Sequence, residues 1–294
     1  RHRKPQPAFL TPSPELFLKK LLVSGFGSCF SLSKSFRNTE NLSDTHNPEF
    51  TLLEWYRTGA SYTDLMSESE NLFKFIYSAV IQKSKIQNQK NTAYKIIYQN
   101  KTVDLTPPWE RITMVEAFKK YADLDLFQIL TPEAIVPVAQ KKGYTITSTD
   151  TWEQIFHQIY LNEVEPNFGR GKPTIIYDFP SQMAALAKKK PDDPRFAERF
   201  EVFIAGLELG DAYSELTDWS EQEERFKSET EERKRLGKIE HPYDQDFLEA
   251  LKIGLPKCAG MALGMDRLVM LFANAKNIQD VLLFPASELW TNGK

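Results

Sequence analysis

GLELGDAYSELTD, residues 206–218, is the stretch that restricts the fold most strongly. Its bulky residues are typical of a β-strand, and yet Glu208, Asp211 and Glu215 recur along it. Carboxylates that pack together repel one another, so we expect a cation among them. A divalent metal on phosphate oxygens and the ammonium group of a substrate both fit. The alternative is a solvated strand edge that binds no ligand.

A second polar region lies upstream, where FRNTE (36–40) is followed by HNPEF (46–50) and LEWY (53–56). These segments predict two antiparallel strands joined by a long turn. An arginine on one strand, opposite Glu54 and Tyr56 on the other, is costly to bury without an anion. A phosphate matches the planar fork of Arg37. The alternative without a ligand is a core salt bridge between Arg37 and Glu54.

The third region is GMALGMDRL, residues 260–268. Its small residues would let a nucleotide base or a phosphate approach the backbone. Arg267 stands at the start of an apolar helix predicted over 266–272, where a cation is badly placed relative to the helix dipole. An anionic ligand is therefore expected at Arg267, with the neighbouring Asp266 as the alternative partner.

The remaining pattern predicts strands in successive antiparallel pairs, with helices grouped between them and no βαβ rhythm. Helices are predicted from Pro14 and over 61–81, 113–121, 150–163 and 220–236. A buried strand is predicted over 29–36, further strands over 50–56, 174–179 and 200–209, the last continuing to 216, and a hairpin over 94–104. This order favours an α+β fold, an antiparallel sheet flanked by helices, in one domain spanning 1–294.

Composition narrows the class of protein. Of the 294 residues 41% are hydrophobic, and the net charge of -3 provides no general basic field for nucleic acid or anionic lipid. No apolar run is long enough to span a membrane. Cys29 and Cys258 do not have the spacing of metal ligands. A reduced, cytoplasmic protein is the expectation.

These regions, taken in chain order, resemble motifs 2 and 3 of the class II aminoacyl-tRNA synthetases. From Ser13 onward the chain is similar to the lysyl-tRNA synthetase branch, as Ser13-Pro14-Glu15 and Tyr177-Asp178-Phe179-Pro180 illustrate. The resemblance implies the class II catalytic domain, from which the N-terminal motif 1 helix that builds the dimer is missing here. It also implies a homodimer, with ATP and Mg²⁺ as cofactors.

The resemblance implies a role for each matching residue on the nucleotide side. Arg37 would bind the α-phosphate, and Arg267, near the γ-phosphate, would be the second catalytic arginine. Phe50 would stack beneath the adenine, and Arg267 would cover its opposite face. The other expected ATP-binding residues are Glu40, His46 and Glu208. Magnesium would be carried by Glu208 and Glu215.

The pocket implied for a lysine-type amino acid consists of Glu15, Glu54, Tyr56, Asp211, Tyr213, Glu215 and Ala262. The substrate carboxylate attacks the α-phosphorus directly, so no covalent nucleophile is required, and catalysis consists of positioning and charge stabilisation. Two positions depart from the family pattern. Glu40 follows Arg37 by three residues instead of two, and Asp211 replaces the common Asn and adds negative charge to the pocket.

Two details favour one paralogue within the branch. Ala262 stands where lysyl-tRNA synthetases usually have glycine, and FPSQMAALA (179–187) resembles the paralogue that modifies elongation factor P. That enzyme activates (R)-β-lysine and transfers it to a lysine side chain of the factor. We therefore expect an elongation factor P (R)-β-lysine ligase, with which the acidic net charge agrees. The alternatives are a lysyl-tRNA synthetase catalytic domain that charges tRNA(Lys) and a non-catalytic lysine-binding regulator. The retained ATP residues argue against the regulator.

Overall fold

The computed structural model describes residues 8–38, 42–83, 94–239 and 241–289, so Glu40 lies outside the described residues. The helices are α1 (Glu15–Val23), α2 (Tyr62–Lys83), α3 (Met114–Ala117), α4 (Pro132–Lys141), α5 (Trp152–Ile159), α6 (Trp219–Arg235), α7 (Gln245–Gly254), α8 (Met265–Ala273) and α9 (Ala286–Leu289). The strands are β1 (Cys29–Phe36), β2 (Glu49–Thr58), β3 (Lys95–Tyr98), β4 (Lys101–Asp104), β5 (Glu110–Thr113), β6 (Thr174–Pro180), β7 (Phe196–Ile204), β8 (Leu207–Ser214) and β9 (Cys258–Gly264).

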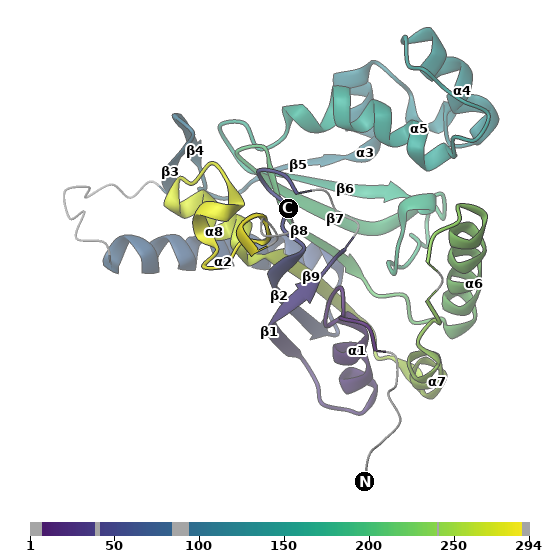
Figure 1. Cartoon of the computed structure of the whole chain (residues 1–294), viewed down its shortest axis with the longest axis horizontal. Helices are drawn as coiled ribbons and strands as arrows, with labels where there is room; N and C mark the ends of the chain where they lie inside the picture. The colour runs from purple at the N-terminus through teal and green to yellow at the C-terminus, as the bar shows by residue number, and fades with distance from the viewer. Residues whose placement is uncertain (1–7, 39–41, 84–93, 240, 290–294) are drawn as a thin grey trace.

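Seven strands form one sheet in the order β1-β2-β9-β8-β7-β6-β5, and β3 and β4 form the predicted hairpin apart from it (Figure 1). The pairs are antiparallel, which confirms the α+β prediction, with one exception. β5 pairs with β6 in parallel, because the chain between them crosses over through α3, α4 and α5. The sequence predicted no βαβ connection, and this prediction was wrong for β5 and β6.

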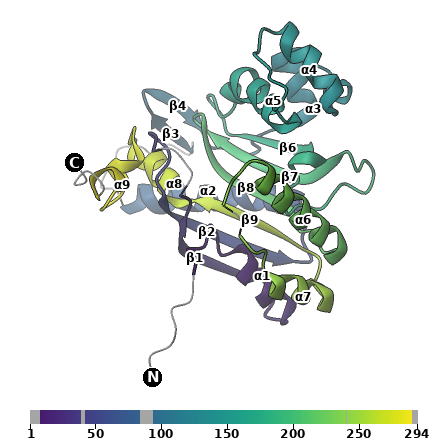
Figure 2. The same cartoon turned by 45° about the vertical axis from the view of Figure 1, so that its right-hand side comes forward.

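The two faces of the sheet differ in polarity, and the register explains why. Trp55, Met261, Ala212 and Phe200 form one row across β2, β9, β8 and β7. All four are buried together with Leu65 of α2, which packs against this face and lies behind the sheet in Figure 2. Side chains alternate between faces along each strand. The neighbouring row therefore faces the other way, and it contains Glu54 and Asp211, two of the polar residues that the sequence singled out.

That second row runs from Glu54 through Ala262 and Asp211 to Glu201. Three carboxylates thus lie side by side across four strands, on the face opposite α2. Isolated polar positions in strand-like sequences are in this way collected into one site by the antiparallel register.

The segment between β5 and β6 forms a helical insertion with its own apolar core, which Figure 1 shows at one end of the sheet. Thr113 and Thr151 begin α3 and α5 with complete capping boxes. α4 was not predicted, although Thr131 followed by Pro132 is a recognisable helix start. A π-helical turn over Tyr160–Val164 ends α5.

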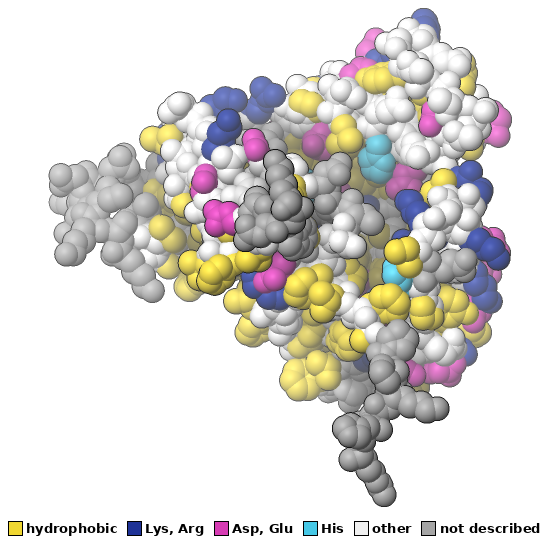
Figure 3. Space-filling model, viewed as in Figure 1, with side chains coloured by type: hydrophobic (Ala, Val, Ile, Leu, Met, Phe, Trp, Pro, Cys, Tyr) yellow, Lys and Arg dark blue, Asp and Glu magenta, His cyan; other side chains and the backbone are white. Residues whose placement is uncertain are grey.

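Two predictions about strands were wrong. The strand predicted to continue from 200 to 216 is broken by a tight turn, because Ala205 and Gly206 adopt φ of 57° and 84°. β1 is an edge strand, so it is not buried as predicted, and Phe30 and Leu32 are 73% and 59% exposed. Figure 3 shows hydrophobic side chains on the surface in this region.

No helix within the described ranges is both long and apolar enough to cross a bilayer.

Candidate active site

A cavity of about 250 Å³ opens on the polar face of the sheet, between the loop after β1, β2, β8 and the start of α8. Its lining contains seven of the residues that the sequence predicted for the site: Arg37, His46, Phe50, Glu208, Asp211, Ala262 and Arg267. Because Asp211 and Ala262 are among them, the cavity reaches the row of carboxylates described above.

Arg37 is exposed at the cavity rim, and the backbone N–H of Arg37 donates to the Pro48 carbonyl at 2.9 Å. The guanidinium lies over the Phe50 ring, 5.0 Å from its centroid. No ion pair joins Arg37 to Glu54, two residues that both lie in the described ranges. The alternative of a core salt bridge is therefore wrong, and the Arg37 guanidinium is positioned to meet an anion in the cavity.

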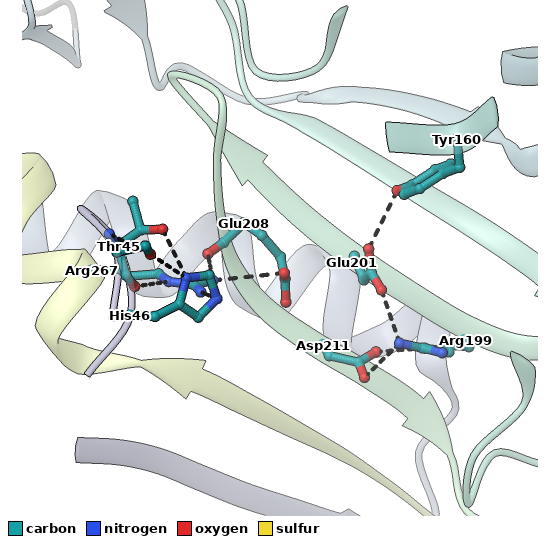
Figure 4. Close-up of polar contacts among 9 residues, drawn as sticks. Thr45, His46, Tyr160, Arg199, Glu201, Glu208, Asp211 and Arg267 are labelled. Atoms are coloured by element: carbon teal, nitrogen blue, oxygen red, sulfur yellow. Dashed lines mark hydrogen bonds and ion pairs between the residues drawn. The ribbon is translucent and has the colours of Figure 1, made fainter. Parts of the chain in front are cut away.

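Arg267 makes four polar contacts (Figure 4). Its Nε donates to the Thr45 carbonyl at 3.1 Å and its Nη1 donates to the Glu208 carbonyl at 2.8 Å. Nη2 lies 2.8 Å from His46 Nε2, and because a guanidinium only donates, this ring nitrogen accepts. Asp266, the alternative partner, instead accepts from the Thr51 backbone N–H at 2.6 Å. The anionic partner of Arg267 within the protein is Glu208, whose Oε2 lies 3.6 Å from Nη1, and the other three acceptors are neutral.

Arg199, which the sequence analysis did not single out, lies among the carboxylates of β7 and β8 (Figure 4). Its Nε and Nη2 donate to the two oxygens of Asp211 at 2.9 and 3.0 Å, and Nη2 also donates to Glu201 at 2.9 Å. The expected extra negative charge from Asp211 is therefore largely neutralised within the protein.

A β-bulge at Leu209 decides where Glu208 lies. Gly210 pairs with Val202 but Glu208 pairs with Phe203, so Leu209 is left over and Glu208 faces the same side as Asp211. Glu208 therefore joins Glu201 and Glu165. Burial and the charge of Glu208 raise the pKa of Glu165 to about 7.

The magnesium expectation needs correction in this geometry. Glu208 and Glu215 lie at opposite ends of an extended strand, separated by roughly 20 Å at ~3.3 Å per residue. They cannot hold one ion between them. Glu201, on the neighbouring strand, is the better companion for Glu208. No group of three or more potential metal ligands occurs among the described residues. A magnesium ion here would use these two carboxylates together with phosphate oxygens, as Mg²⁺ commonly does.

A separate, deeper cluster of carboxylates surrounds Lys19 of α1, beyond Ala262. Lys19 is 1% exposed, and its Nζ lies 2.6 Å from Glu15 Oε1 and 2.5 Å from Glu215 Oε2. The Tyr213 hydroxyl also donates to Glu15 Oε1 at 2.6 Å. Burial would lower the pKa of Lys19, but the charges of Glu15 and Glu215 outweigh burial and raise it.

Glu54 completes this cluster. Its Oε1 accepts from the Tyr56 hydroxyl at 2.6 Å, whereas Oε2 is buried with no hydrogen-bond partner in the described part of the chain. Burial and the charge of Glu15 raise the pKa of Glu54 to about 7. Burial also raises the pKa of Glu215 to about 8, against the attraction of Lys19. A buried carboxylate oxygen without a partner is costly, so this cluster is incomplete without a cation.

The structure thus divides the predicted residues into two groups. The cavity collects Arg37, His46, Phe50, Glu208, Asp211, Ala262 and Arg267, and the deeper cluster collects Glu15, Glu54, Tyr56, Tyr213 and Glu215. The sequence pattern did not indicate Lys19, Arg199 or Glu201. The spacing of Glu15 and Lys19, i and i+4 on a helix, was the available signal for Lys19.

The sheet, the arginine-lined cavity and the adjoining carboxylates define a class II aminoacyl-tRNA synthetase catalytic domain. In agreement, the family model described as tRNA synthetases class II (D, K and N) matches residues 1–288. The chain belongs to this family.

Three relatives illustrate the similarity, and all three are lysine–tRNA ligases. The chain is 38% identical over 279 residues to a lysine–tRNA ligase of Pelotomaculum thermopropionicum and 39% identical over 279 residues to that of Bacillus subtilis. These alignments cover 94% and 95% of the chain and 53% of each relative. A lysine–tRNA ligase of Staphylococcus aureus is 36% identical over 271 residues, 92% of the chain and 52% of the relative. The chain spans about half the length of these relatives.

Proposed function

We propose that this protein binds ATP and a lysine-type amino acid in the cytoplasm and joins them as an aminoacyl-adenylate. The observation that carries the proposal is the buried, incomplete carboxylate cluster beside an arginine-lined cavity. Glu15, Glu54 and Glu215 supply three carboxylates and Lys19 one ammonium, so the cluster carries two net negative charges when all three carboxylates are ionised. A diamino acid brings two ammonium groups.

The proposed chemistry follows from the relative positions of the carboxylate cluster and the arginine-lined cavity. A substrate held by its ammonium groups in the cluster directs its carboxylate past Ala262 towards the cavity. Arg37 would bind the α-phosphate that this carboxylate attacks, and Arg267 would bind the outer phosphates. Mg²⁺ on Glu208 and Glu201 would neutralise the phosphate charge. Pyrophosphate leaves as the carboxylate–phosphorus bond forms, so positioning and electrostatics suffice.

For the acceptor, the names of the relatives support transfer of lysine to tRNA(Lys). A protein acceptor, the lysine side chain of elongation factor P with (R)-β-lysine as the transferred group, is the second candidate. A specific observation favours it. A groove of about 1040 Å³, which shares Glu208 with the nucleotide cavity, is lined by eight Glu but only three Lys and Arg. It lies between the insertion and α6, a hollow visible in Figure 3. Such a groove repels a phosphate backbone and suits a cationic protein segment.

Pyrophosphate exchange into ATP with L-lysine and with (R)-β-lysine, measured side by side, tests the proposal. Exchange that depends on either amino acid is the expected result, and exchange with neither would refute adenylate formation. A preference for L-lysine, followed by transfer to tRNA(Lys), supports the first acceptor. A preference for the β isomer, with transfer to elongation factor P, supports the second.

The affinity for lysine should rise with pH between about 6 and 8.5. The pKa values of Glu54, about 7, and Glu215, about 8, lie above the usual range because of burial. Below these values the empty cluster holds protons that an incoming ammonium must displace. Above them the carboxylates are ionised and bind it directly. The KM for lysine should therefore be roughly ten-fold or more higher at the acidic end. A KM for lysine that does not change over this range would contradict the prediction.

A further inference from the structure

Lys19 occupies a cation position inside the proposed amino-acid pocket. It lies on α1, whose first residue is Glu15, and it reaches the end of β8 at Glu215. Its Nζ also lies 5.4 Å from the centroid of the Tyr213 ring. A buried lysine with two carboxylates is expensive to desolvate and seldom adds net stability. Its position next to unpartnered carboxylate oxygens points to a role in recognition.

Two buried carboxylate oxygens remain without a hydrogen-bond partner once Lys19 is in place. Lys19 takes Glu15 Oε1 and Glu215 Oε2, while Glu54 Oε2 and Glu215 Oε1 are buried without a hydrogen-bond partner in the described ranges. Both available oxygens belong to groups that contact Tyr56 or lie close to it. An ammonium group can therefore bind at two places in this cluster. One lies between Glu15 and Glu215 and is filled by Lys19, and the other lies at the unpartnered oxygens of Glu54 and Glu215.

We propose that Lys19 is a specificity-determining residue, which blocks the position between Glu15 and Glu215 and directs the substrate ammonium to the unpartnered oxygens of Glu54 and Glu215. This inference rests on the proposed function. Without Lys19 the ammonium of the substrate itself would be drawn to the vacated position. The amino acid would then bind with its carboxylate displaced from the nucleotide.

The charged and titratable groups around Lys19 come from every neighbouring element. They are Glu15 on α1, Glu54 and Tyr56 on β2, Tyr213 and Glu215 at the end of β8, and Cys258 on β9. Lys19 is the cation in direct contact with Glu15 and Glu215. The charge of Arg37 also acts on this cluster, because it lowers the pKa of Glu54. Removing Lys19 therefore changes the charge of the pocket and opens space at the same point.

Chemical rescue tests this inference. In Lys19→Ala, the kcat for lysine-dependent pyrophosphate exchange should fall about ten- to a hundred-fold, with a smaller change in KM, because lysine still binds but in a displaced position. Millimolar ethylammonium should fill the vacated position and restore much of the lost kcat. Ethanol, which has a similar size and no charge, should not. Lys19→Met fills the space without a charge and should lose kcat without any response to ethylammonium.

Lys20→Ala is the matched control. The neighbouring lysine also forms an ion pair, at 2.6 Å with Asp244, but with the N-cap residue of α7 instead of the carboxylate cluster. The kcat of Lys20→Ala should equal that of the unaltered protein and should not change when ethylammonium is added. Thermal melting shows whether each variant is folded at the assay temperature.

The possible outcomes distinguish a failure of this inference from a failure of the proposed function. If the unaltered protein shows no lysine-dependent exchange, the proposed function is refuted and the role of Lys19 with it. If that exchange is present but folded Lys19→Met keeps the unaltered kcat and KM, the inference alone is overturned. Equal rescue of Lys19→Ala by ethanol and ethylammonium would overturn it as well, since the lost property would then be volume.

Discussion

Replacing Arg37 by alanine should lower the rate of adenylate formation by roughly 10²- to 10³-fold, the usual cost of removing one donor that stabilises a developing charge. The fold should survive the change. Arg37 is exposed, forms no ion pair with Glu54 and lies over the ring of Phe50, a cation–π contact whose loss costs about 0.5–1 kcal/mol at an exposed site. Arg37→Ala should thus lower the rate of adenylate formation strongly and the free energy of unfolding only slightly.

Pyrophosphate exchange at saturating lysine and ATP, together with thermal unfolding, measures both effects. Lys34→Ala is the matched control. It removes a cation from β1, the strand that ends just before Arg37, and the Nζ of Lys34 lies 3.3 Å from Glu49 and outside the cavity. Lys34→Ala should retain the exchange rate. A large loss of stability in Arg37→Ala with unaltered exchange in the folded fraction would refute the assigned role of Arg37.

The sequence was sufficient to predict the two strands around Arg37 and Glu54, because antiparallel pairing follows from alternating residues and a long turn between them. It was also sufficient for the α+β class. It failed at the turn after Ile204, where Ala205 adopts a left-handed conformation that the residue type does not indicate. It failed for β1 because burial depends on which strand lies at the sheet edge, a property of the whole topology.

In the candidate site, residue types were easier to predict than distances between them. Glu208 and Glu215 both fit a cation site, yet a bulge at Leu209 aligns Glu208 with Glu201, and the length of β8 separates it from Glu215. Arg199 and Lys19 were missed for a related reason. A basic residue on a strand or helix suggests a solvated surface, and only the register or the helix packing reveals the carboxylates that surround it.

The glycine in position 260 illustrates the same limit and leads to the second large effect. The sequence suggested that small residues over 260–264 let a nucleotide approach the backbone. In the structure Gly260 lies opposite Tyr56 in the register of β2 and β9, and it is absent from the lining of the cavity. A Cβ added at Gly260 would overlap the Tyr56 ring and lie 2.5 Å from Glu215 Oε1. The lack of a side chain at Gly260 therefore makes room for Tyr56 and Glu215 of the proposed amino-acid pocket.

Gly260→Ala should consequently disable lysine binding. Both neighbours belong to the carboxylate cluster, so the methyl group must displace the Tyr56 ring, the Glu215 carboxylate or both. Overpacking of this kind costs typically about 1–3 kcal/mol of stability. The displaced carboxylates should raise the KM for lysine at least roughly a hundred-fold, since a misplacement of ~1 Å has effects of that size. Exchange kinetics at varied lysine and thermal unfolding would measure the two effects.

Gly264→Ala provides the comparison on the same strand. A Cβ there would meet its nearest neighbour, the Leu209 carbonyl oxygen, at 3.7 Å, which is ordinary van der Waals contact. Gly264 lines the proposed nucleotide cavity, so the methyl group of Gly264→Ala should affect the KM for ATP. The KM for lysine should stay within about two-fold of the unaltered value. If Gly260→Ala instead keeps the lysine KM, the Tyr56 and Glu215 side chains move aside freely, and the pocket is not the rigid carboxylate cluster on which the proposed recognition of lysine depends.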